Sequence, residues 1–285
     1  MIEFLNVSYV YGKDTPFEKE AVSNISFKIE DGLVTGIIGH TGSGKSTVAR
    51  MMNALISPAE GKVLLNGADI NESKRTAYLS RSKVGLVFQY PEYQLFEETV
   101  WKDIAFGPSN MGLSPSEIEE RVLMASEFTG ISRELLQKSP FDLSGGQKRR
   151  VAIAGVIAML PDVLVLDEPA AGLDPRGRRE ILERLSKYKD EKGRAVVIIS
   201  HSMEDVAEFS DRIIAVSDGA LLAEGTPAQV FSHYDEIVAS GLETPEVTSV
   251  MNELRAMGLD VPGDVFTVDE AYRILRAYVS EKGGN

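Results

Sequence analysis

The sequence predicts an α/β fold built around a mainly parallel sheet, and two patterns carry this prediction. The run from Val34 to Ile38 is apolar almost throughout, which is typical of a strand buried on both faces, and a glycine-rich turn and an amphipathic helix follow it. Three later apolar runs, at 163–166, 195–200 and 212–216, are separated by helical stretches. This alternation indicates βαβ units, whose strands run parallel.

The other elements follow from local patterns. Short β-rich runs open the chain at 2–7 and 26–29, and the helix after the glycine-rich turn should start near Gly44 because the apolar spacing becomes helical there. The acidic stretch from Leu113 to Gln137 has a helical pattern and is predicted to form an inserted lobe. Ser116 and Glu119 have the spacing of a capping box near its start.

The last 60 or so residues form a separate region. The composition loosens after residue 227, and a turn at 241–245 precedes a helical pattern with apolar residues at 247, 250, 251 and 254. A second short helix should start at Thr267, which has capping-box spacing to Glu270. Since so short a region buries little by itself, we expect it to pack on the main domain or on a partner.

Composition excludes several classes of function. The 285 residues carry 30 Lys and Arg against 43 Asp and Glu, a net charge of -13, which argues against a nucleic-acid partner and leaves room for a basic one. There is no cysteine, so disulfides and cysteine metal sites are absent. The first residues lack a signal-peptide pattern, and the longest uncharged apolar run, Val151 to Leu160, is half a membrane span. We therefore expect a soluble, cytoplasmic chain.

A phosphate-binding motif lies between the predicted strand and helix. It matches G-x-x-x-x-G-K-[ST], and its glycines let backbone N–H groups turn inward around a phosphate at a helix N-terminus. The lysine neutralises the outer phosphates, and the final hydroxyl can ligate Mg²⁺. The motif residues are Gly39, His40, Thr41, Gly42, Ser43, Gly44, Lys45 and Ser46.

Two acids end the apolar run at 163–166. The strand should deliver Asp167 and Glu168 at its carboxyl end, where α/β sheets bind ligands. Asp167 is suited to the Mg²⁺ shell, and Glu168 to orienting or deprotonating an attacking water. Acids also cap strands at surfaces, so this run depends on the phosphate motif for its interpretation.

A second anion site is predicted at 143–147, where Leu-Ser-Gly-Gly-Gln precedes a basic triplet and a mostly buried helix. Such a start exposes free N–H groups and a hydroxyl. The predicted binding residues are Ser144, Gly145, Gly146 and Gln147. One nucleotide does not need two phosphate cradles in one chain.

Taken together, these three motifs in this order resemble the nucleotide-binding subunit of ABC proteins, over residues 2 to 225 or so. The resemblance implies a P-loop NTPase fold with a mainly parallel core sheet, an antiparallel β subdomain, an inserted helical subdomain near 90–160, and a C-terminal extension at 226–285 that contacts the dimer partner. It also implies a head-to-tail dimer in which ATP, with Mg²⁺, lies between the P-loop of one subunit and the LSGGQ of the other. The second cradle is thereby explained.

Further residues take their roles from this resemblance. Tyr11 looks like the aromatic that stacks on adenine, although it could be an ordinary edge aromatic, and Thr47 extends the P-loop. Gln89 looks like the sensing glutamine, a catalytic and metal-contacting position, and Asp174 belongs to the D-loop. His201 looks like the switch histidine beside the γ-phosphate, with a surface residue as the alternative.

Three other positions have plainer interpretations. The side chain of His40 is assigned no chemistry, and His233 is expected at the surface. Ala170 stands where the family usually has Thr, a departure expected to be mild.

A finer resemblance is to the ATPases of energy-coupling factor importers, including cobalt-type ATPases. Its carriers are the runs at 15–18, 39–47, 88–96 and 105–108; the histidine of the P-loop and the Thr-Pro-Phe-Glu insert at 15–18 resemble the second of two paired paralogues. The resemblance implies a peripheral protein on the cytoplasmic face of the cell membrane. It implies an identical or paralogous ATPase partner, a transmembrane coupling protein and a substrate-capture membrane protein.

The sequence is compatible with three alternative interpretations. The acidic residues Glu92, Glu97 and Glu98 suggest docking of an arginine-bearing coupling helix, or simply a solvated charge run. A soluble ABC protein acting in DNA repair or translation is a second class, disfavoured by the acidic charge and by the lack of coiled-coil or zinc insertions. A purely regulatory ATP-binding partner is a third, which the complete set of catalytic residues disfavours.

Overall fold

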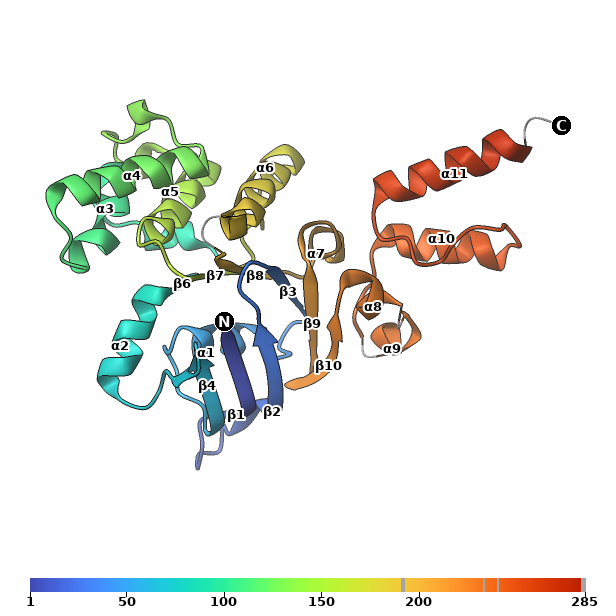
Figure 1. Cartoon of the computed structure of the whole chain (residues 1–285), viewed down its shortest axis with the longest axis horizontal. Helices are drawn as coiled ribbons and strands as arrows, with labels where there is room; N and C mark the ends of the chain where they lie inside the picture. Colours follow the sequence, from blue (N-terminus) through green and yellow to red (C-terminus); the bar gives the residue numbers. More distant parts are fainter. Residues whose placement is uncertain (191–192, 233, 240, 283–285) are drawn as a thin grey trace.

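A computed structural model describes residues 1–190, 193–232, 234–239 and 241–282. Its centre is a six-stranded sheet in which β10 is antiparallel to its neighbour and the other strands run parallel (Figure 1). His233, which is expected at the surface, lies outside the described residues. In spatial order the strands are β10 (Ala220–Gly225), β9 (Arg212–Ser217), β3 (Val34–Ile38), β8 (Ala195–Ile199), β7 (Val163–Asp167) and β6 (Val84–Val87).

Strand order in this sheet brings distant segments together. β3 lies between β8 and β9, and β7 pairs with β8 in a register that places Asp167 opposite Ile199. Every residue of β3, β7 and β8 is buried, as expected for parallel strands covered on both faces. Since parallel strands end at the same edge, the loops after β3, β7 and β8 meet there.

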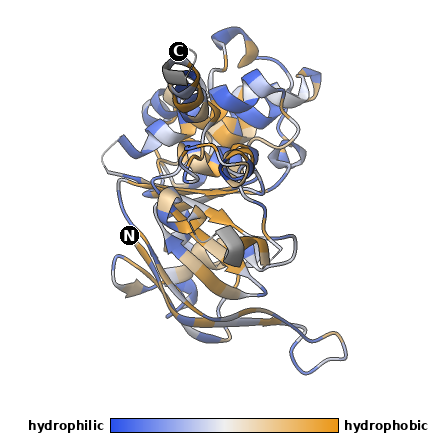
Figure 2. Cartoon of the chain, turned by 90° about the vertical axis from the view of Figure 1, so that its right-hand side faces the viewer, coloured by the Kyte–Doolittle hydropathy of each residue, from blue (hydrophilic) through white to orange (hydrophobic). Residues whose placement is uncertain are grey.

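A second, antiparallel sheet covers one face of this centre. Helix α1 (Lys45–Met52) packs in one hydrophobic core with strands of both sheets, and Figure 2 shows hydrophobic residues concentrated in the middle of the molecule. The four strands in spatial order are β2 (Lys19–Ile29), β1 (Ile2–Tyr11), β4 (Glu60–Leu65) and β5 (Ala68–Asp69).

Helices form a lobe beside the sheet, as the sequence predicts. They pack together in a second core that also takes residues from β6, β7 and β8. The capping box at the start of α4 is formed by Ser114 and Glu117, so the prediction of Ser116 and Glu119 is wrong. Pro115 is the reason: its fixed φ and missing N–H suit the first helical position, which leaves Ser114 as the cap. The helices are α3 (Val100–Asn110), α4 (Pro115–Thr129) and α5 (Gly145–Ile157), with α2 (Lys74–Lys83) nearby.

Two helices follow the strands that carry the site. α6 (Pro175–Ser186) comes after β7, and α7 (Met203–Phe209) comes after β8. The short 3₁₀ turns are η1 (Pro91–Gln94), η2 (Arg133–Leu135), η3 (Pro140–Asp142) and η4 (Lys187–Asp190).

The chain beyond β10 is helical. α8 (Pro227–Phe231) and α9 (Tyr234–Ala239) contribute to a core shared with β9 and β3, whereas α10 (Glu246–Ala256) and α11 (Val268–Lys282) share a small core of their own. In Figure 1 these last two helices extend away from the sheet. None of the helices in the described part of the chain has both the length and the apolar character needed to cross a bilayer.

Candidate nucleotide site

The phosphate motif forms the turn between β3 and α1, and its backbone needs glycine at two positions. A Cβ on Gly39 would lie 2.3 Å from the Val216 carbonyl oxygen. Gly44, the N-cap of α1, has a φ of 107°, and a Cβ there would lie 2.4 Å from the Ala21 carbonyl oxygen. These close approaches explain why the motif needs small residues: the loop is wedged between β9 and β2.

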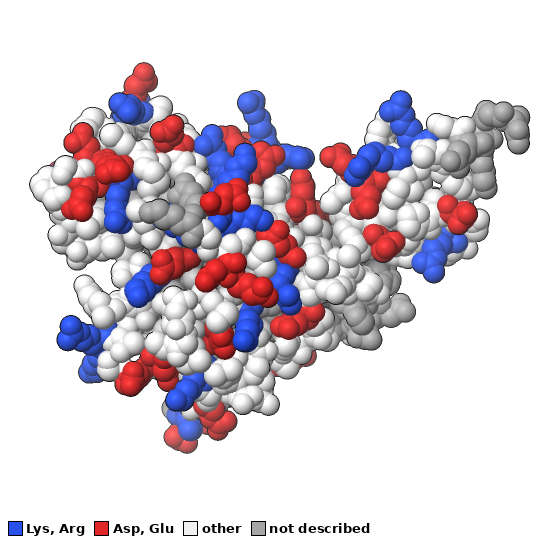
Figure 3. Space-filling view, in the orientation of Figure 1, with Lys and Arg blue, Asp and Glu red and all other residues white. Residues whose placement is uncertain are grey.

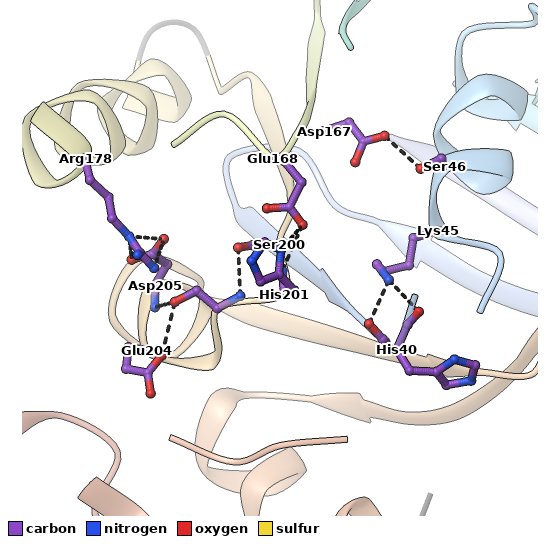
Figure 4. A network of polar contacts seen from close by, with 12 residues as sticks. His40, Lys45, Ser46, Asp167, Glu168, Arg178, Ser200, His201, Glu204 and Asp205 are labelled. Atoms are coloured by element: carbon purple, nitrogen blue, oxygen red, sulfur yellow. Dashed lines mark hydrogen bonds and ion pairs between the residues drawn. The ribbon is translucent and has the colours of Figure 1, made fainter. Parts of the chain in front are cut away.

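Lys45 points back over this loop. Its ammonium donates to the carbonyl oxygens of Gly39 at 2.7 Å and His40 at 2.9 Å (Figure 4). Burial lowers the pKa of Lys45, while the carboxylates of Glu168 and Asp167 act in the opposite direction. A half-buried ammonium group that is bonded only to neutral carbonyl oxygens would bind a phosphate more strongly, because hydrogen bonds between opposite charges are the stronger ones. A phosphate would therefore replace these two carbonyl partners.

Ser46 and Asp167 meet across the carboxyl edge of the sheet. The Ser46 hydroxyl donates to Asp167 Oδ2 at 2.8 Å. Burial raises the pKa of Asp167, and the Ser46 hydrogen bond and the charges of Lys45 and Arg50 oppose the rise. Nearby positive charge favours the ionised form of this buried carboxylate, so the site is suited to binding a cation.

Glu168 and His201 form the second polar pair of this edge. Glu168 Oε1 accepts the His201 backbone N–H at 3.0 Å and lies 2.8 Å from His201 Nδ1. Glu168 has a φ of 54°, uncommon for a non-glycine residue, while its N–H donates to the Ile199 carbonyl at 2.9 Å. The carboxylate is nearly buried, whereas the His201 side chain is 75% exposed and therefore faces solvent.

An open cavity of about 200 Å³ lies beside the phosphate loop. Tyr11 lines it and its hydroxyl lies 3.2 Å from Thr47 Oγ1. Lys19 also lines it, directly opposite Tyr11 in the β1–β2 register, and the sequence reasoning missed this residue because strand register is not visible in one sequence. The lining residues are Tyr11, Lys19, Ala21, Gly42, Gly44, Lys45, Ser46 and Thr47.

Other predicted residues lie on separate elements. Ser144 caps α5 through a reciprocal capping box with Gln147, and Asp174 caps α6 by accepting the Gly177 N–H at 2.8 Å. Gln89 follows β6 and is exposed. The structure thus joins the phosphate loop, the two acids, His201 and Tyr11 around one edge, and it leaves Ser144 to Gln147 outside the cavity lining.

His40 has a contact that the sequence did not suggest. Its Nε2 lies 3.4 Å from Asp218 Oδ1, and its Nδ1 lies 3.0 Å from the Thr41 carbonyl oxygen. The side chain therefore turns toward the β9–β10 hairpin, away from Lys45 (Figure 4).

The acidic residues at 92–98 do not form one free patch. Glu92 pairs with Arg149 through bonds of 2.9 and 3.1 Å, and Glu98 pairs with Lys102 at 2.6 Å. Glu92 therefore has a partner within the chain, and docking of a coupling helix beside Glu97 and Glu98 stays a prediction. On the face shown in Figure 3 acidic and basic side chains are interspersed.

A family model described as ABC transporter matches residues 22–171. The energy-coupling factor transporter ATP-binding protein EcfA2 of Caldanaerobacter subterraneus is 51% identical over 278 residues, 98% of this chain and 97% of that protein. The protein of the same name from Clostridium perfringens is 49% identical over 275 residues, 96% of each chain.

Solved structures agree with this assignment. CbiO1 from Clostridium perfringens, part of the ABC transporter complex cbiONQ, has a TM-score of 0.75 and 36% identity, covering 88% of this chain and 98% of that one. The ATP-binding cassette MJ0796, in a dimeric post-hydrolysis state with ADP and Pi, has a TM-score of 0.72 and 29% identity, covering 80% and 99%. The predicted fold class is confirmed, and the chain belongs to the ABC transporter family, within the energy-coupling factor transporter ATP-binding proteins, as an ATP-binding ATPase.

Proposed function

We propose that this chain is the motor subunit of an energy-coupling factor importer, and that it hydrolyses ATP at sites shared between two ATPase subunits paired head to tail. The observation that carries the proposal is that the nucleotide cavity is lined by only one of the two sets of residues expected to contact ATP. Tyr11 and the phosphate loop line it, whereas Ser144 to Gln147 begin α5 in the helical lobe. A second subunit, identical or paralogous, would supply that sequence.

Within each half-site the residues divide the work. Tyr11 would stack on the adenine, and Lys45 would exchange the carbonyls of Gly39 and His40 for the outer phosphates. Glu168 would orient the attacking water or take its proton, because it is the carboxylate held at the edge by His201. His201 presents its exposed ring beside it, where a γ-phosphate would come within reach.

The donors at the edge also fit Mg²⁺. Hydroxyl and carboxylate oxygens are the hard ligands that this ion prefers, and Ser46 Oγ and Asp167 Oδ2 already lie 2.8 Å apart. Ser46 and Asp167 would hold the ion, with Gln89 reaching it from the neighbouring loop. When bound, Mg²⁺ neutralises negative charge on the β- and γ-phosphates.

A groove beside the helical lobe supports a transmembrane partner. A cavity of about 590 Å³ lies between α2 and α3, and apolar side chains at its rim remain exposed in the chain by itself. We propose that an apolar helix of the coupling protein docks here and keeps the ATPase on the cytoplasmic face of the membrane. The exposed apolar residues of this groove are Tyr78 (65%), Leu79 (51%), Phe106 (46%) and Met111 (38%).

The decisive experiment on hydrolysis is Glu168→Gln. The variant should keep ATP binding, form a more stable dimer with ATP and lose most turnover, because the amide keeps the shape of the side chain and cannot act as a base. Phosphate release and light scattering with ATP measure both effects, with Glu119→Gln, an exposed position on α4, as the control. Undiminished hydrolysis would remove Glu168 from its role, and full turnover by solitary chains would overturn the shared site.

A separate experiment tests the groove. Tyr78→Ser with Phe106→Ser should abolish co-purification with the membrane complex and leave ATP binding intact, since both side chains are exposed in the subunit. Phe17→Ser is the matched control, because Phe17 is 86% exposed outside the groove. Equal co-purification of both variants would contradict docking at this surface.

A further inference from the structure

Glu204, in the first turn of α7 and three residues after His201, accepts hydrogen bonds from two different parts of the chain. One carboxylate oxygen, Oε2, accepts a hydrogen bond from the hydroxyl of Ser202 at 3.1 Å, and Ser202 in turn caps α7 by accepting the Asp205 N–H at 3.2 Å. The other oxygen, Oε1, accepts the backbone N–H of Glu246 at 3.1 Å. The Glu204 side chain therefore joins the C-terminal extension to the His201 loop, the segment between β8 and α7.

The bond to Glu246 supplies an acceptor for a free backbone N–H group at the start of α10. Its N-cap is Pro245, which has no side-chain acceptor for the free N–H groups of the first helical turn. A carboxylate from α7 takes that role and also opposes the positive end of the helix dipole. The start of α10 is thus held by a residue 42 positions earlier in the chain.

A cavity lies beside this bond, between the two regions that the bond joins. A cavity of about 460 Å³ separates α6 and α7 from α10 and α11, and residues of both sides line it. An apolar contact also joins the two regions through Phe266, whose ring centroid lies 5.6 Å from that of Phe231, and the Glu204 bond adds a polar contact to it. The lining residues are Arg179, Glu204, Glu208, Glu246, Val247, Phe266, Thr267, Val268, Asp269 and Arg273.

The extension itself is internally braced. Thr248 is buried and donates to the Val265 carbonyl at 2.6 Å, and Asn252 donates to the Gly263 carbonyl at 3.3 Å. These bonds tie α10 to the segment that leads into α11. A displacement at the first turn of α10 would therefore move both helices together.

We infer that Glu204 is a positioning residue for hydrolysis, which holds the His201 loop in place by anchoring it to the C-terminal extension. Hydrogen bonds join Glu168 to His201, Ser202 to Glu204 and Glu204 to α10, and His201 and Ser202 are adjacent in the chain. The extension therefore stabilises the catalytic edge of its own subunit. The effect on turnover rests on the proposed role of His201, whereas the contact itself does not.

The test is a substitution that removes the backbone N–H hydrogen of residue 246. Glu246→Pro deletes the N–H that Glu204 accepts, and proline suits this first helical position. Pro245 already has φ -51° and ψ 133°, the extended conformation that a residue before proline requires. We expect kcat of the full chain at saturating ATP to fall about threefold, the worth of an ordinary hydrogen bond, with KM for ATP unchanged.

Glu246→Ala is the matched control, because it removes the same side chain and keeps the N–H. Glu204→Ala also loses the Ser202 bond, so it should lower kcat at least as much as the proline variant. Glu204→Gln should restore kcat through its amide oxygen, and the double variant Glu204→Ala with Glu246→Pro should be no worse than Glu204→Ala alone. Hydrogen exchange at the amide of residue 246 should be faster in Glu204→Ala than in the parent. Equal kcat for the proline and alanine variants at 246, or equal exchange, would overturn the inference.

His201→Ala separates this inference from the proposed function. If that variant keeps full turnover, the switch role of His201 fails, and the exchange measurement still decides whether Glu204 holds α10. Should the proline variant have a lower melting temperature, the comparison of Glu204→Ala with Glu204→Gln decides the effect on turnover.

Discussion

The ion pair between Glu92 and Arg149 offers the sharpest prediction about stability. The Arg149 side chain is only 4% exposed and Glu92 17%, and the guanidinium also donates to the Ala171 carbonyl. Glu92→Ala would leave a buried cation with one neutral partner, and breaking such a pair costs about 3 kcal/mol or more. At roughly 2 °C per kcal/mol for a chain of this size, Tm should fall by about 6 °C.

The reverse change should cost less. Arg149→Met leaves Glu92, whose edge reaches water, and replaces the cation with an apolar side chain of similar length, so we expect a loss of about 1 kcal/mol. Glu98→Ala, which breaks the exposed pair with Lys102, should leave Tm unchanged. Calorimetry of the three variants checks this order. A Tm for Glu92→Ala equal to that of Glu98→Ala would refute the reasoning from burial.

Two further predictions concern a partly buried acid and the phosphate loop. Burial raises the pKa of Asp103 above its ordinary value of 3.8, against the hydrogen bonds from the N–H groups of Phe96 and Glu97, so its ionised form destabilises the fold at neutral pH. Asp103→Asn should therefore raise Tm at pH 7, and the gain should shrink as pH falls through the raised pKa toward 3.8; a gain independent of pH would contradict this cause. Gly44→Ala should weaken ATP binding at least tenfold in calorimetric titration, because φ is 107° and the new Cβ would meet the neighbouring strand, whereas Gly42→Ala, with φ 86° and open space, should lose less. Equal losses would show that the close approach has no influence.

Local sequence determined the parts of the site that lie next to one another in the chain. The apolar run at 34–38 and the helical spacing after Gly44 predicted the strand, turn and helix around the phosphate loop, and α1 begins at Lys45. The run ending in Asp167 and Glu168 placed two acids at the end of a buried strand. Side-chain period and backbone demands of this kind are properties of neighbouring residues, so one sequence reveals them.

Other local predictions were incomplete. The first strand extends to Tyr11 and the second begins at Lys19, both beyond the predicted runs, and β6 at 84–87 was not predicted. The run at 84–87 contains a glycine and is not followed by a phosphate motif or a pair of acids, and so short a run does not by itself distinguish a strand from a helical segment. These strands are defined by their partners across the sheet.

Tertiary structure alone decided which distant residues meet. Glu168 contacts His201 because β7 and β8 are neighbours in the sheet, and the same kind of long-range pairing brings Glu92 to Arg149 and Glu204 to the first turn of α10. Strand order and helix packing depend on the burial of the whole core, which no short segment encodes. The sequence by itself therefore determined the chemistry of each group, and the fold decided which groups act together.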